Sequence, residues 1–160
     1  MNERTGAKGA LLDEYERVIR ELQGVIADIS PDELTFIVDG NTGNLDCRSI
    51  QTILAHVISS GYSYANYIRK FQNAPHIHKD KTPRNSVAEY NLDFSDLVVY
   101  NIETFNYFSE EDVYPAEMGR KILTRWDKEY DIEQLLEHAI VHILRHRRQI
   151  ENFKRKLKQK

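Results

Sequence analysis

Residues 131–157 read DIEQLLEHAIVHILRHRRQIENFKRKL, and their apolar positions recur with the 3.6-residue period of an α-helix. The apolar face consists of Ile132, Leu135, Leu136, Ala139, Ile143, Ile150, Phe153 and Leu157. Asp131 precedes this face, where its carboxylate can accept a hydrogen bond from the free N–H groups of a helix start. The stretch therefore predicts an amphipathic helix from Ile132 to Leu157, about 40 Å long at roughly 1.5 Å per residue.

Three further segments show the same periodicity, and each predicts another long helix. They run from Glu3 or Ala10 to Asp28, from about Ser49 to Phe71, and from Val87, capped by Ser86, to about Phe108. Between them, Ser30 and Pro31 suit the start of a short helical turn, and residues 121–126 suggest a short extended piece. No segment has a strong strand pattern. The sequence thus predicts an all-α protein built as a four-helix bundle.

The composition is that of a globular protein rather than a membrane or disordered one. The 160 residues suffice for one domain, expected to cover residues 1–160, with 41% hydrophobic residues, 29% charged residues and a net charge of −3. Residues 49–68 lack charge, but interspersed Ser, Thr, Asn, Gln and His residues argue against a transmembrane span. A single cysteine, Cys47, and the absence of an apolar leader predict a cytoplasmic location.

The last predicted helix carries three histidines at four-residue spacing: His138, His142 and His146. Side chains four residues apart lie on the same side of a helix, so two imidazoles can bind one metal ion. At about 100° per residue, His146 lies about 30° from the centre of the apolar face, His142 about 70° and His138 roughly 110°. The inner pair is therefore His142 and His146, and His138 belongs at the rim.

A third candidate ligand lies on the helix predicted for residues 49–71. His56 falls beside its apolar face, in an uncharged polar strip that also holds Ser60 and Ser63 and could line a pocket or pack on a second subunit. Three neutral imidazoles favour zinc or nickel, with iron, manganese or copper as alternatives. Three protein ligands leave a position open for water or substrate, as in catalytic sites.

Three motifs resemble the DinB/YfiT-like metalloproteins. They are Leu54-Ala-His56, the run from Tyr130 to His138, and His142-x-x-x-His146-Arg-Arg-Gln149-Ile150. The resemblance spans nearly the whole chain and implies a bundle in up-down-down-up order with a three-histidine divalent-metal site. Applied to this sequence, the resemblance implies that the metal ligands are His56, His142 and His146. Arg145 and Arg148 depart from the family pattern, which has a histidine and a glycine there, but neither position is a ligand.

The resemblance also implies a range of activities. Characterised members are thiol S-transferases, a thiol-dependent isomerase or proposed hydrolases. We therefore expect a metal-dependent thiol S-transferase or hydrolase acting on a small molecule, with a metal-bound water or thiol as the reactive group. No catalytic base is identified. Gln149 and His138 are expected beside the metal or at the pocket mouth.

Two other interpretations stay open. The protein could be a metal-binding bundle without catalysis, or the basic residues 145–160 could contact nucleic acid. The nucleic-acid interpretation is disfavoured, because basic residues also stabilise the carboxyl end of a long helix and no aromatic residues are interleaved with them. The uncharged stretch at residues 49–68 of the second long helix further predicts a homodimer.

Overall fold

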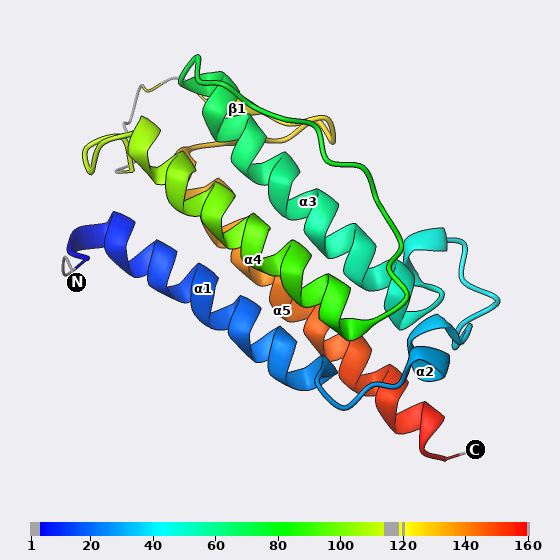
Figure 1. Ribbon diagram of the computed structural model, residues 1–160. Helices are drawn as coiled ribbons and strands as arrows, with labels where there is room; N and C mark the ends of the chain where they lie inside the picture. Colours follow the sequence, from blue (N-terminus) through cyan, green and yellow to red (C-terminus); the bar gives the residue numbers. More distant parts are fainter. Residues whose placement is uncertain (1–3, 114–118, 120, 160) are drawn as a thin grey trace.

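A computed structural model describes residues 4–113, 119 and 121–159 and contains four long helices. These are α1 (Gly6–Ile26), α3 (Ile50–Phe71), α4 (Val87–Thr104) and α5 (Ile132–Leu157). Helices α1 and α5 run in one direction, and α3 and α4 run in the opposite one, as Figure 1 shows. This is the predicted all-α bundle in up-down-down-up order. No described helix combines the length and apolar character that crossing a bilayer requires.

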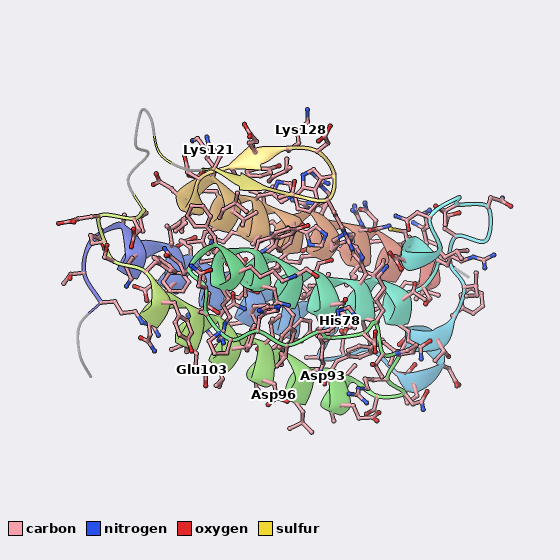
Figure 2. The ribbon with its side chains drawn as sticks, turned by 90° about the horizontal axis from the view of Figure 1, so that it is seen from above. His78, Asp93, Asp96, Glu103, Lys121 and Lys128 are labelled. Atoms are coloured by element: carbon pink, nitrogen blue, oxygen red, sulfur yellow. The ribbon has the colours of Figure 1, made fainter. Side chains whose placement is uncertain are left out.

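Short elements complete the described chain. Helix α2 covers Pro31–Thr35, 3₁₀ turns cover Leu45–Cys47 and Phe105–Tyr107, and strands β1 (Ile122–Leu123) and β2 (Glu129–Tyr130) form a hairpin. Figure 2 shows this hairpin beside α5, with Lys121 and Lys128 on it, while Asp96 and Glu103 lie along α4 on the other side of the bundle.

The predicted helix boundaries need two corrections. The helix expected to reach Phe108 ends at Thr104 and tightens into a 3₁₀ turn, a common way for a helix to end. The first helix ends at Ile26 rather than Asp28, and of its two expected starts Glu3 lies outside the described residues. The predicted caps are confirmed: the side chains of Ser30, Ser86 and Asp131 accept hydrogen bonds from the backbone of α2, α4 and α5.

Helix α3 packs against both α4 and α5. Its uncharged polar side chains hold the long connection between α3 and α4. The side-chain groups of Gln51, Ser59 and Asn66 donate to backbone carbonyls of that connection at 2.9, 2.9 and 2.6 Å. These uncharged polar residues of α3 therefore have partners within one chain, and the homodimer stays a prediction from the sequence.

A glycine allows α3, α4 and α1 to approach closely at the centre of the bundle. A Cβ atom at Gly61 would lie 2.8 Å from Leu97 Cδ2 and 3.0 Å from the Tyr15 hydroxyl. Both neighbours are buried, so they have little room to move away. This contact fixes the position of α3, and with it the position of His56 relative to α5.

Candidate metal centre

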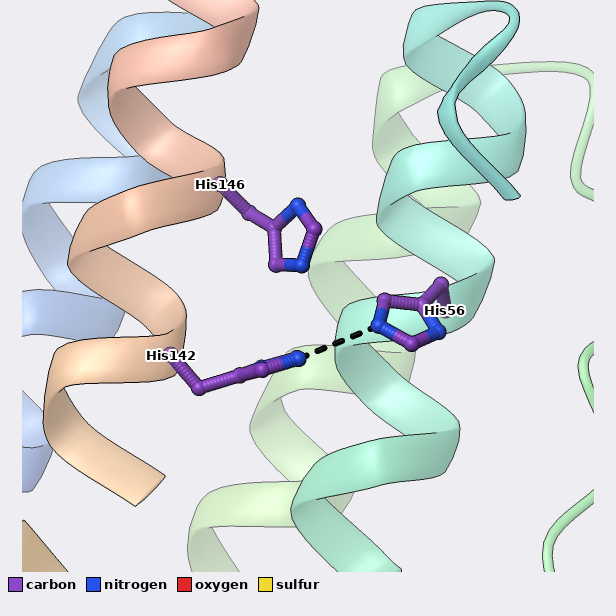
Figure 3. A group of neighbouring side chains, drawn as sticks. All are labelled: His56, His142 and His146. Atoms are coloured by element: carbon purple, nitrogen blue, oxygen red, sulfur yellow. Dashed lines mark hydrogen bonds between the residues drawn. The ribbon is translucent and has the colours of Figure 1, made fainter. Parts of the chain in front are cut away.

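Three histidines from two helices converge on one point inside the bundle. Helix α3 presents His56, and two successive turns of α5 present His142 and His146, whose rings point toward it (Figure 3). One ring nitrogen from each histidine lies within 4.8 Å of the others. The closest pair is Nε2 of His56 and Nε2 of His142, at 3.0 Å. The structure thus brings together the three residues that the sequence singled out.

The three imidazoles are held in their neutral form. Burial, followed by the nearby histidines, lowers the pKa of His142 to about 3, and the same causes lower the pKa of His56 to about 4. Burial also lowers the pKa of His146, opposed by its hydrogen bond to Gln149. A neutral imidazole keeps a lone pair on one ring nitrogen, which is the form that binds a metal.

The donor set fits a divalent cation. Two nitrogens bound at ~2.0–2.1 Å around a tetrahedral centre lie roughly 3.3–3.4 Å apart. The 3.0 Å separation of the His56 and His142 nitrogens is close to this value, so a small widening would accommodate an ion. Without an ion, two buried imidazoles this close can share only one hydrogen bond. Three nitrogen ligands leave at least one position open for water or a substrate.

Two polar side chains stand behind the ligands and orient them. The Nδ1–H of His146 donates to Gln149 Oε1 at 3.0 Å, which leaves Nε2 free for a metal. On the opposite side, Nδ1 of His56 lies 3.1 Å from Asp46 Oδ2. This buried nitrogen is not aligned for a full hydrogen bond and has no other partner among the described residues. Asp46 is in turn held by Lys81 Nζ at 2.6 Å. A carboxylate behind a ligating histidine fixes its tautomer and raises its basicity.

We expect the substitution Asp46→Asn to weaken zinc binding by about 10- to 100-fold, because it removes the charge that supports His56 as a ligand. Competition titration of the purified protein against a chromophoric chelator measures this change. Asp80→Asn is the matched control, since Asp80 lies exposed on the neighbouring connection and pairs only with His78 among the described residues. Equal affinities of the Asp46 variant and the wild-type protein would refute the role of Asp46.

An aromatic wall closes one side of the centre. Trp126, in the turn of the β1–β2 hairpin, stacks on His138 with ring centres 5.7 Å apart. Tyr64 of α3 packs edge-on against both His138 and His142 at 5.4 and 5.5 Å. Tyr130 Oη lies 3.4 Å from His138 Nδ1. His138 is therefore half-buried at the rim, where it belongs to this wall rather than to the convergent group.

The remaining sequence candidates occupy more peripheral positions. Ser60 is buried in α3, and the Ser63 hydroxyl donates to the Ser59 carbonyl of its own helix at 3.0 Å. Neither makes a hydrogen bond to the three histidines among the described contacts. Glu137 of α5 is exposed in a groove between α1 and α5, away from the centre.

The sequence did not identify Asp46, Tyr64 or Trp126 as parts of the site. Asp46 follows a loop rich in Asn and Gly and belongs to no periodic pattern. Tyr64 appeared only as part of the apolar face of its helix, and Trp126 only as part of a short extended piece. Their proximity to the histidines arises from contacts between distant segments, so no local signal marks them.

Comparison with known proteins agrees with this geometry. A search of curated proteins finds no match to the chain. The sequence profile of the DinB superfamily matches residues 14–150, a region that includes all three convergent histidines. This match extends from the third turn of α1 to about two turns before the end of α5, and so includes most or all of every long helix of the bundle. The chain therefore belongs to the DinB superfamily.

Proposed function

We propose that the protein is a metal-dependent enzyme, a thiol S-transferase or hydrolase, that acts on a small molecule at the three-histidine centre. The observation that carries this proposal is the convergence of three neutral imidazoles without a fourth protein ligand among the described residues. A closed set of four ligands is typical of structural sites, whereas three ligands and an open position are typical of catalytic ones.

The residues of the centre would have separate roles in the reaction. His56, His142 and His146 would hold the cation, and Asp46 and Gln149 keep two of these rings oriented. A divalent cation bound there lowers the pKa of a coordinated water or thiol and so supplies a nucleophile near neutral pH. The aromatic wall excludes water from one side and leaves a flat apolar surface for the substrate.

Zinc and nickel are the cations that we propose first. An all-nitrogen donor set suits borderline cations better than magnesium or calcium, which prefer oxygen ligands. Iron, manganese and copper remain candidates, because three imidazoles can also bind them and availability decides among such metals.

The test is turnover that depends on the metal. Protein stripped with a chelator is reloaded in turn with zinc, nickel, iron, manganese or copper, and each form is assayed with low-molecular-weight thiols plus electrophiles and with hydrolysable esters and amides. We expect turnover to disappear on stripping and to return with at least one metal. Stoichiometric metal binding without turnover of any combination would instead favour a non-catalytic metal-binding bundle.

The structure weakens the nucleic-acid alternative. Three of the basic residues near the end of the chain already have acidic partners: Arg147 pairs with Glu21, Arg148 with Glu151, and Lys154 with Asp28. Lys154 also donates to the carbonyl of Val25 at 2.5 Å, near the end of α1. Arg147 and Lys154 connect α5 to α1 and the segment after it, whereas Arg148 pairs within α5, as expected for structural roles. A cytoplasmic location and a homodimer stay predictions from the sequence.

A further inference from the structure

The electrostatic balance of the centre favours an anionic ligand once a divalent cation is bound. The three histidines are neutral, and no acidic residue belongs to the convergent group. Asp46 is the acid next to His56, and its charge is already matched by Lys81 at 2.6 Å. The charge of a bound divalent cation would therefore lack compensation by the described residues. A partly buried cation in this position strongly favours a negatively charged ligand.

Two arginines flank the centre from different elements. Arg145 lies on α5 between His142 and His146, and it shares with His138 the side of the helix that borders the aromatic wall, because seven residues make two turns. Arg125 lies in the turn of the hairpin, where its backbone N–H donates to Tyr67 Oη of α3 at 2.9 Å. The residue after Arg125 is Trp126, which stacks on His138.

Each guanidinium group influences a different histidine of the centre, and both influence Tyr64. Arg125 contributes to lowering the pKa of His56, and Arg145 contributes to lowering the pKa of His142, although burial is the largest cause for both histidines. Both arginines also oppose the raised pKa of Tyr64, whose largest cause is again burial. These effects agree with the geometry, in which Arg125 lies on the hairpin next to Trp126 and Arg145 lies on α5 between two of the histidines.

These two arginines differ from the others in lacking a partner. Seven arginines of the described chain form ion pairs: Arg4, Arg17, Arg20, Arg69, Arg84, Arg147 and Arg148. The guanidinium groups of Arg125 and Arg145 are exposed, and neither has an ion pair or side-chain hydrogen bond to the rest of the described protein.

We propose that the ligand of this centre is a small molecule with a carboxylate group, which Arg125 and Arg145 bind while its reacting atom faces the three histidines. This proposal rests on the proposed metal-dependent function and adds the substrate class. The planar fork of an arginine matches the two oxygens of a carboxylate. Because one arginine is on a hairpin and the other is on a helix, the anion would also join the hairpin to the bundle.

The test compares two thiols of equal length on the full-length protein loaded with cobalt, whose absorption spectrum reports a new sulfur ligand. The probes are 3-mercaptopropionate and the uncharged 3-mercaptopropanol. We expect the acid to bind at least about tenfold more tightly. The variants Arg125→Gln and Arg145→Gln should each weaken binding of the acid by about 5- to 10-fold and change binding of the alcohol less than about twofold. Arg125→Lys keeps the charge but not the planar fork of the guanidinium group. Its affinity for the acid should lie between those of the wild-type protein and Arg125→Gln.

Two substitutions serve as charge-matched controls. Lys128→Gln removes a positive charge from the same hairpin, and Arg155→Gln removes one from the exposed end of α5. Neither should change the preference for the acid by more than about twofold, because neither charge is among those that shift the pKa of His56, His142 or His146. The controls separate a local anion site from a general effect of net charge.

The results distinguish failure of this proposal from failure of the proposed function. Equal binding of the two thiols, a preference that survives in the double variant, or no binding of either thiol by the cobalt-loaded protein would overturn the carboxylate site alone. A wild-type protein that fails to bind cobalt, or any of the other divalent metals, would overturn the metal-dependent function on which this proposal rests.

Discussion

The double substitution His142→Ala/His146→Ala is expected to reduce zinc affinity by at least about 1000-fold, or roughly 4 kcal/mol. Two of the three convergent nitrogens are lost, and His56 alone cannot hold an ion inside the bundle. Either single variant should retain two of the three nitrogen ligands and lose less zinc affinity than the double variant. Isothermal titration with zinc, together with elemental analysis of the purified proteins, measures both effects.

A pair of His→Ala substitutions at exposed positions away from the centre provides the control. His76 and His78 lie exposed on the connection between α3 and α4, and the double variant His76→Ala/His78→Ala should bind zinc like the wild-type protein. His138→Ala tests whether His138 lies outside the metal site. It should reduce zinc affinity far less than His142→Ala does. Circular dichroism establishes that each variant keeps its helical content. Full zinc occupancy in the His142/His146 variant would show that the ion binds elsewhere.

The substitution Arg69→Ala is expected to lower the free energy of unfolding by about 3–4 kcal/mol. Arg69 is only 4% exposed and joins three segments. Its guanidinium donates to Thr104 Oγ1 at 2.7 Å, to the Tyr100 carbonyl at 2.8 Å and to the Pro75 carbonyl at 3.1 Å. It also lies 3.7 Å from the centre of the Tyr100 ring. Truncation would remove all of these hydrogen bonds and leave a cavity, although the Tyr100 carbonyl would still accept from Thr104 Oγ1.

Urea denaturation followed by circular dichroism measures this loss. Lys70→Ala is the control, because Lys70 is the next residue of α3 and its side chain is exposed, so it should change stability by no more than about 0.5 kcal/mol. Arg69→Lys keeps a charge but cannot reach all three acceptors, and its stability should lie between those of the wild-type protein and Arg69→Ala. A loss below about 1 kcal/mol for Arg69→Ala would show that these contacts are dispensable.

The helices and the three histidines could be predicted from the sequence because both depend on local spacing. The apolar period of residues 131–157 predicted α5 with its observed boundaries, Ile132 and Leu157, and its cap, Asp131. The angular positions of His142 and His146 relative to that apolar face follow from the helix geometry alone. His56 could be paired with them because it lies beside the apolar face of a helix that had to pack in the same core.

What surrounds the histidines was decided by the tertiary structure. Asp46 approaches His56 from the segment before α3, and Lys81 approaches Asp46 from the connection that follows α3. Trp126 and Arg125 lie on a hairpin of two-residue strands; the sequence predicted an extended piece at residues 121–126, but not its pairing with β2 or its place beside His138. These positions depend on how loops cross the finished bundle. The periodicity of the chain specifies which side of each helix is buried, but it carries no information about which distant loop will lie over that side.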